Sequence, residues 1–138
     1  MKKVFTVGVF DLLHVGHVEL FRRAKSLGDW LVVAVQDSEE VTRYKPDTTP
    51  VFSTEERMYM VKSIRYVDAV VCYHDVDQII KEVDFDVFVA GPDQVHDGFQ
   101  RAMEWCSKNG KDVVVLPRTE KISSTHIKDL IKGNDGHE

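Results

Sequence analysis

The fold is decided by residues 3–35, KVFTVGVFDLLHVGHVELFRRAKSLGDWLVVAV. Lys3 to Val9 is rich in β-branched and aromatic residues and predicts a strand. Residues 18–27 carry apolar side chains at helical spacing, and Gly28 follows as a natural end to a helix. Leu31 to Val35 is a continuous apolar run of strand length, which is typical of a parallel sheet covered on both faces. The stretch therefore predicts a β-α-β unit.

The same alternation of strand and helix continues along the chain. Further strands are predicted at residues 69–73, 86–90 and 113–116, and further helices from the capping-box residue Ser53 to about Arg65, at 76–83, at 99–108 and at 124–132. This order predicts a three-layer α/β fold, a Rossmann-like, parallel five-stranded sheet with helices on both faces. We expect a single domain over residues 1–132, followed by a polar tail at residues 133–138.

Residues 36–52 interrupt this alternation. They contain Pro46, Pro50 and a polar Asp-Thr-Thr insert, and their apolar residues follow neither the helical nor the strand period. A segment of this length without regular structure is usually functional or mobile in a compact domain. We therefore predict a functional or mobile loop here.

Composition excludes several classes of protein. The chain has 138 residues, of which 43% are hydrophobic and 30% charged, and its net charge is -5. These values are typical of one globular domain and argue against a general nucleic-acid-binding protein. No apolar run approaches the roughly 18 residues that a membrane-spanning helix needs. Cys72 and Cys106 are too few for a disulfide framework, so we expect buried thiols in a reducing cytoplasm.

The turn after the first strand carries the residues suited to chemistry. His14 and His17 flank Gly16 at the start of a predicted helix, where free backbone N–H groups and the helix dipole attract anions. Gly16 lets a phosphate approach the backbone, and each imidazole can donate a hydrogen bond to a phosphoryl oxygen. The glycine-rich fingerprints of dinucleotide-binding and P-loop proteins are absent. The pattern predicts a polyphosphate site. Two alternatives are that the histidines are ordinary polar residues of a turn, or that they bind zinc, although no third ligand lies at a convincing spacing.

A second polar cluster follows the last predicted strand, at residues 118–125. Arg118 offers a planar fork for a phosphate or a base edge, and Ser123, Ser124 and Thr125 offer hydroxyl groups at another helix start. Capping of that helix is the simpler interpretation of these hydroxyl groups. The carboxyl ends of parallel strands share one edge of the sheet, and ligands bind there where the strand order reverses. We therefore expect both clusters to converge on one crevice.

Residues 8–11 (Gly-Val-Phe-Asp), 14–17 (His-Val-Gly-His) and 118–125 (Arg-Thr-Glu-Lys-Ile-Ser-Ser-Thr) resemble the motifs of a known family. It is the cytidylyltransferase branch of the HxGH nucleotidyltransferase superfamily, and within it the glycerol-3-phosphate cytidylyltransferases. The resemblance implies transfer of CMP from CTP to a small phosphorylated alcohol, with release of pyrophosphate. It implies in-line attack of the acceptor phosphate on the α-phosphorus without a covalent intermediate, and Mg²⁺ bound mainly through the CTP phosphates. It also implies a cytoplasmic homodimer, since residues 65–68 (Arg-Tyr-Val-Asp) resemble a dimer-contact segment of the family.

The resemblance also assigns roles to individual positions. The catalytic residues would be His14, His17, Lys45 and Arg118. The CTP-binding residues would be Gly8, Val9, Phe10, Asp11, Gly16, Gly91, Asp93, Arg118, Thr119, Ile122, Ser123, Ser124 and Thr125. The residues that bind the acceptor would be Asp11, Asp37, Arg57, Arg65 and Asp93. No residue is assigned to a resident metal ion.

Two departures from the family pattern concern the acceptor. Gly91-Pro92-Asp93-Gln94 replaces a more acidic stretch, and Asp37-Ser38 has the reverse of the usual order. Both border the expected acceptor pocket and favour an acceptor other than glycerol 3-phosphate. Lys121 also stands where the family usually has glycine. Three alternatives remain open: an adenylyltransferase of the same superfamily that uses ATP, a nucleotide-binding regulatory module without turnover, and a flavodoxin-like redox domain.

Overall fold

The described residues form one sheet of five parallel strands in the order β3-β2-β1-β4-β5. The structure is a computed structural model, and it describes residues 1–117 and 130–131. The strands are β1 (Lys3–Gly8), β2 (Trp30–Gln36), β3 (Ala69–Tyr73), β4 (Val87–Ala90) and β5 (Asp112–Val115). The helices are α1 (Val15–Lys25), α2 (Ser38–Tyr44), α3 (Thr54–Lys62), α4 (Val76–Glu82) and α5 (Asp97–Lys108).

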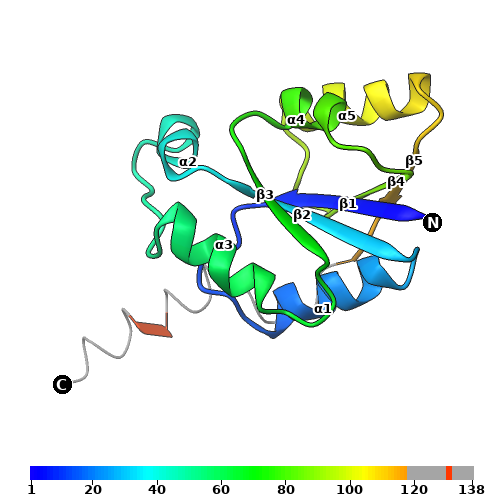
Figure 1. Cartoon of the computed structure of the whole chain (residues 1–138). Helices are drawn as coiled ribbons and strands as arrows, with labels where there is room; N and C mark the ends of the chain where they lie inside the picture. The colour runs from blue at the N-terminus through cyan, green and yellow to red at the C-terminus, as the bar shows by residue number, and fades with distance from the viewer. Residues whose placement is uncertain (118–129, 132–138) are drawn as a thin grey trace.

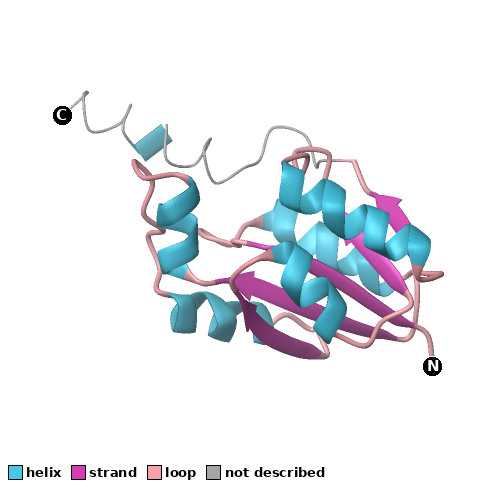
Figure 2. Cartoon of the chain, turned by 90° about the horizontal axis from the view of Figure 1, so that it is seen from above, coloured by secondary structure: helices cyan, strands magenta, loops and turns pink. Residues whose placement is uncertain are grey.

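Helices cover both faces of this sheet. In Figure 1, α4 and α5 lie above the sheet and α1 and α3 lie below it, and Figure 2 looks down on the α4–α5 layer. Successive strand residues point to opposite faces, so Phe5 packs in the core beneath α4 and α5 while Val4 packs against α1 and α3. The two apolar faces explain the continuous apolar runs in the sequence. The predicted three-layer, Rossmann-like fold is confirmed.

The predicted elements agree closely with the observed ones, with one exception. The strand at residues 69–73 is confirmed residue for residue, and the other described strands and helices begin or end within a few residues of their predicted bounds. The prediction of an irregular loop at residues 36–52 is wrong in part, because the short helix α2 lies within it. Of the last predicted helix, only Leu130 and Ile131 fall within the described residues, and both are helical.

Hydrogen bonds to side chains explain where α2 and α3 begin. The predicted capping box at α3 is confirmed, since Ser53 Oγ accepts from the Glu56 N–H at 3.1 Å and the Ser53 N–H donates to Glu56 Oε1 at 2.9 Å. Helix α2 has only Val41 buried and so shows no apolar period. Its start is held by α3 instead, because the Ser38 N–H donates to Thr54 Oγ1 at 3.0 Å.

Two further expectations concern the membrane and the cysteines. Within residues 1–117 and 130–131, no helix is both long enough and apolar enough to cross a membrane. Cys72 and Cys106 are both free thiols, as the sequence predicts. Cys106 is buried in the core, but Cys72 is exposed on the edge strand β3, so the prediction of a buried thiol is wrong there.

Candidate active site

A cavity of about 650 Å³ opens at the carboxyl ends of the strands. It spans the boundary between β1 and β4, where the chain order in the sheet reverses. This is the position at which parallel α/β sheets bind their ligands. The predicted site residues that line it are Gly8, Val9, Phe10, Asp11, His14, Gly16, His17, Lys45, Gly91 and Asp93.

The backbone after β1 makes an unusual turn. Phe10 and Leu12 have φ angles of 55° and 50°, in the left-handed region that non-glycine residues rarely adopt. The Phe10 ring folds back over β1, where a Cβ added to Gly8 would lie 2.7 Å from Phe10 Cζ. The same ring meets His17 edge-on, with centroids 5.5 Å apart. Glycine at position 8 and the strained turn together place an apolar support beside His17.

Asp11 fixes this turn to the segment before α3. It is 5% exposed, and its two carboxylate oxygens accept from the backbone N–H groups of Val51 at 2.7 Å and Phe52 at 3.0 Å. Hydrogen bonds to an ionised carboxylate are stronger than neutral ones. Asp11 therefore joins the histidine turn to residues 51 and 52, which directly follow Pro50 in the cavity wall.

His14 and His17 form a capping box made of two imidazoles. His14 Nδ1 accepts from the Gly16 N–H at 3.0 Å, and His17 Nδ1 accepts from the His14 N–H at 3.2 Å. An accepting nitrogen of a neutral imidazole carries no proton, so the proton lies on Nε2 of each ring. The rings are stacked, with centroids 3.9 Å apart. The turn thus brings two Nε2–H donors, on stacked rings inclined by 27°, to the lining of the cavity.

Both imidazoles are held neutral near pH 7. Burial lowers the pKa of His14. Burial, followed by the neighbouring His14, lowers the pKa of His17 to about 4, although Asp11 acts in the opposite direction. Neutral rings keep Nδ1 free to cap the helix and Nε2–H free to donate to a ligand.

Arg57 ties the carboxyl ends of β1 and β2 to α2 and α3. Its side chain is 0% exposed, and burial lowers the pKa of its guanidinium. All of its nitrogens donate hydrogen bonds. The acceptors are the backbone oxygens of Phe52 (3.1 Å), Val9 (2.8 Å) and Gln36 (2.8 Å) and the hydroxyl groups of Ser38 (2.7 Å) and Thr54 (3.3 Å). The guanidinium therefore offers no surface to a substrate phosphate, and we correct its predicted role from acceptor binding to positioning.

Gln94 closes the boundary between β1 and β4. Its side-chain oxygen accepts from the Gly91 N–H, and its side-chain nitrogen donates to the Val7 oxygen, both at 2.9 Å. The amide thereby joins the turn after β4 to the end of β1 and holds the segment that contains Asp93 at the cavity. The sequence analysis assigned no role to Gln94, because its contact with Val7 joins residues that are far apart in the chain.

These observations agree with the comparison to known families. The model of the Cytidylyltransferase-like family matches residues 5–130. The chain belongs to this family. It is therefore a nucleotidyltransferase, as the motifs of the histidine turn predict.

Relatives of known name cover nearly the whole chain. It is 42% identical over 136 residues to the glycerol-3-phosphate cytidylyltransferase of Bacillus subtilis, covering 96% of this chain and 99% of that protein. It is 39% identical over 138 residues to the protein of the same name from Staphylococcus aureus, covering 98% of each. It is also 38% identical over 136 residues to the bifunctional protein HldE of Cronobacter sakazakii, covering 96% of this chain and 28% of that protein.

A solved structure supports the fold assignment for this family member. The lipopolysaccharide core biosynthesis protein from Thermoplasma volcanium has a TM-score of 0.71 and 29% identity to it. The match covers 88% of this chain and 99% of that one.

Two other predicted acceptor-binding residues lie away from the cavity lining. Arg65 is exposed and lies between the end of α3 at Lys62 and the amino end of β3. The cavity lies at the carboxyl ends of the strands, which is the other end of the sheet. Asp37 precedes α2, where it accepts from Thr54 Oγ1 at 3.2 Å and lies 3.5 Å from His74 Nδ1. Within one chain, neither residue lies in the described cavity wall, and their assigned roles in acceptor binding stay predictions.

The second polar cluster, at residues 118–125, lies outside the residues that the structure describes. It contains Arg118, Thr119, Ile122, Ser123, Ser124 and Thr125. The described chain lines the cavity as far as Leu116 and Pro117, directly before Arg118 in sequence. The roles assigned to the cluster by resemblance stay predictions.

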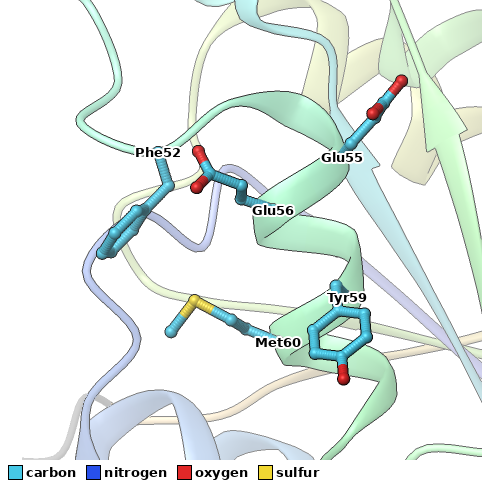
Figure 3. A pocket seen from close by; sticks show the side chains of 5 residues that line it. All are labelled: Phe52, Glu55, Glu56, Tyr59 and Met60. Carbon is cyan, nitrogen blue, oxygen red and sulfur yellow. The ribbon is translucent and has the colours of Figure 1, made fainter.

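A second, shallower pocket of about 330 Å³ lies on α3 and the segment before it (Figure 3). Its lining residues are Phe52, Glu55, Glu56, Tyr59 and Met60. Two carboxylates and three largely apolar side chains offer no positive group to a nucleotide. The chemistry of this family therefore belongs to the larger cavity.

Proposed function

We propose that this chain transfers CMP from CTP to a small phosphorylated alcohol, giving a CDP-linked product and pyrophosphate. The observation that carries the proposal is the stacked histidine pair, whose two Nε2–H donors meet the cavity at the reversal of strand order. Relatives named glycerol-3-phosphate cytidylyltransferase, at 42% and 39% identity, support the choice of CTP and of this acceptor class.

The reaction needs alignment and charge stabilisation more than a strong base. An oxygen of the acceptor phosphate is already ionised at neutral pH, so it attacks the α-phosphorus directly. The new bond joins this oxygen to the α-phosphorus, and the bond from the α-phosphorus to the oxygen that bridges to the β-phosphorus breaks. The electron pair leaves with pyrophosphate. Catalysis of such transfers rests on positioning and on donors aimed at the charge that develops.

His14 and His17 supply those donors. Their Nδ1 atoms are occupied by backbone N–H groups, which fixes both rings before substrate arrives. Each Nε2–H then donates to a phosphoryl oxygen whose negative charge grows in the transition state. Because the rings are neutral, they act as hydrogen-bond donors and give up no proton.

Charged side chains from two other segments complete the described part of the cavity. Lys45, directly after α2, and Arg23, on α1, both line it and can attract a polyphosphate. Asp93 lines it on the β4 side. We therefore propose phosphate binding for Lys45, in agreement with its predicted catalytic role.

Mg²⁺ fits this cavity as an ion carried by the nucleotide. Residues 1–117 and 130–131 contain no group of three side chains able to hold a metal ion, and Mg²⁺ commonly keeps its waters and binds through substrate phosphates. We propose that Asp93, which lines the cavity, would help to hold such an ion. When bound, the ion would neutralise part of the triphosphate charge.

We also propose that the chain forms a homodimer in the cytoplasm and has no nucleic-acid partner. The dimer proposal is supported by residues 65–68, which resemble a dimer-contact segment of the family, and by β3, which forms an open edge of the sheet. Analytical ultracentrifugation checks the dimer, because a monomer at micromolar concentration would contradict it.

Pyrophosphate release tests the main proposal. Wild-type protein is incubated with Mg²⁺, either CTP or ATP, and a panel of phosphorylated alcohols, polyols and amino-alcohols. We expect release with CTP and at least one phosphorylated alcohol, and little with ATP. Release with ATP alone would identify an adenylyltransferase, and tight CTP binding without release for any acceptor would identify a regulatory module.

A further inference from the structure

The cavity has an aromatic wall in addition to the histidine pair. Tyr44 at the end of α2 and His96 and Phe99 at the start of α5 all line the cavity. The Tyr44 and His96 rings are stacked with centroids 6.0 Å apart, and His96 meets Phe99 edge-on at 4.6 Å. Helices α1 and α5 cover opposite faces of the sheet (Figure 1), so the histidine pair at the start of α1 and His96 at the start of α5 lie on either side of the strand ends.

His96 is held in the same way as His14. Its Nδ1 accepts from the Gly98 N–H at 3.1 Å, which places the ring proton on Nε2. Gly98 is required for this arrangement, since a Cβ there would lie 2.9 Å from His96 Cε1. No residue in the described ranges 1–117 and 130–131 accepts a hydrogen bond from His96 Nε2. A fixed imidazole therefore brings a third Nε2–H donor to the cavity.

Tyr44 is also fixed, by a contact between α2 and the start of α4. Its hydroxyl group donates to Asp75 Oδ1 at 2.5 Å. The side chain is still 58% exposed, so part of the ring is open to a ligand. The pair of rings thus offers a ligand an exposed aromatic surface and one N–H donor.

The charge of this wall distinguishes it from the histidine turn. The first turn of α1 contains no acidic residue, whereas the first turn of α5 contains Asp97. Carboxylates near a helix start oppose the binding of a further anion. They are good acceptors for hydroxyl groups. The wall therefore suits a neutral, hydroxyl-bearing group better than a phosphate.

We infer that Tyr44 and His96 bind the hydroxyl-bearing end of the acceptor and select a phosphorylated polyol. His96 Nε2–H donates to a hydroxyl oxygen of the polyol, and the Tyr44 ring covers its carbon chain. The acceptor phosphate then points across the cavity toward His14, His17 and Lys45. This inference rests on the proposed cytidylyltransferase function and adds the acceptor class and the residues that select it.

Steady-state kinetics with two conservative variants test the inference. His96→Asn keeps a side chain that caps helices well but removes the Nε2–H donor. Tyr44→Phe keeps the ring but removes the hydroxyl group that donates to Asp75. With CTP and a polyol phosphate, we expect His96→Asn to raise the acceptor KM roughly tenfold and Tyr44→Phe to raise it about threefold, the range for one lost hydrogen bond. The KM for CTP should stay at the wild-type value.

A second acceptor and two control variants make the test specific. With ethyl phosphate, which has no further hydroxyl group, His96→Asn should change the acceptor KM less than about twofold, because the bond to His96 is absent. Tyr59→Phe on α3 and Arg101→Gln on α5 remove polar groups that do not line the cavity, and both should behave as wild type.

Three results would overturn the inference. They are an unchanged polyol-phosphate KM in His96→Asn, an equal increase with both acceptors, and a preference of the wild-type protein for phosphoethanolamine or phosphocholine over polyol phosphates. Any of these with CTP-dependent turnover intact contradicts the inference alone. Absence of turnover with CTP and every acceptor contradicts the proposed function as well.

Discussion

Each histidine of the first turn uses one ring nitrogen to cap α1 and has the other ring nitrogen available to a ligand in the cavity. The Nδ1 atoms of His14 and His17 accept backbone N–H groups of the turn, and the Nε2 atoms carry the protons. Stability and chemistry therefore depend on the same rings, but on different atoms. Substitutions that preserve one nitrogen's contact and remove the other can separate the two roles.

His17→Gln provides this separation. Glutamine is a common third residue of a capping box, so the variant should keep the bond to the His14 N–H and fold as wild type. It loses the preorganised donor, and we expect turnover to fall by about 10²–10³. His17→Ala should lose as much turnover and, in addition, about 1 kcal/mol of unfolding free energy. Pyrophosphate release and urea unfolding measure the two effects; near-normal turnover in both variants would remove His17 from the mechanism.

The lowered pKa of His17 predicts a pH-dependent stability. The folded pKa is about 4, below the ordinary value of 6.5, so between these values the unfolded chain binds more protons than the folded one. The free energy of unfolding should therefore rise with pH from about 4 to 6.5 and then level off, by roughly 3 kcal/mol from this group. Urea unfolding across this range, in wild type and His17→Gln, checks it. The same slope in both proteins would contradict the assignment.

At the scale of elements, α3 holds the cavity together through one buried side chain. Arg57 connects the ends of β1 and β2 to the start of α2 and to the segment before α3. A lysine has one nitrogen and cannot reach all of these acceptors. The helix thereby fixes the distance between the histidine turn and the Tyr44 side of the cavity.

Arg57→Lys tests the positioning role. We expect a loss of roughly 3 kcal/mol in unfolding free energy, because several buried oxygen atoms lose their donor. Arg101→Lys is the matched control: Arg101 is exposed on α5 and should change stability by less than about 0.5 kcal/mol. Urea unfolding measures both. Unchanged stability in Arg57→Lys together with a raised substrate KM would restore the predicted contact with a phosphate.

At the scale of the whole molecule, the cavity depends on the order of the strands. The order β3-β2-β1-β4-β5 places β1 at the centre and leaves a gap between the turns that follow β1 and β4. Gln94 bridges these turns on one side, and Asp11 ties the histidine turn to residue 51 on the other. A ligand that fills the cavity therefore contacts segments that separate when the chain unfolds.

Nucleotide binding should accordingly stabilise the folded chain. At a CTP concentration one hundred times its Kd, with Mg²⁺, we expect the free energy of unfolding to increase by about 2.7 kcal/mol. Thermal unfolding with CTP, with ATP and without nucleotide measures this effect. A larger shift with ATP than with CTP would favour an adenylyltransferase.

The sequence by itself determined the three layers of this protein and the position of the histidine turn in its candidate active site. Apolar runs and helical periods are local features, so they predicted the described strands, α1 and α3–α5, and with them the parallel sheet. The motif at residues 8–17 predicted the histidine turn for the same reason, because helix start, glycine and imidazoles lie next to one another in the chain.

Tertiary structure decided the remainder. Helix α2 has no apolar period and depends on contacts with α3, and Arg57 is buried because acceptors from distant segments surround it. The wall at Tyr44 and His96 brings α2 and α5 together, although its signal, the histidine-x-glycine spacing shared by residues 14–16 and 96–98, was present in the sequence. Such features depend on hydrogen bonds and ring contacts between residues far apart in the chain, and only folding brings those residues together.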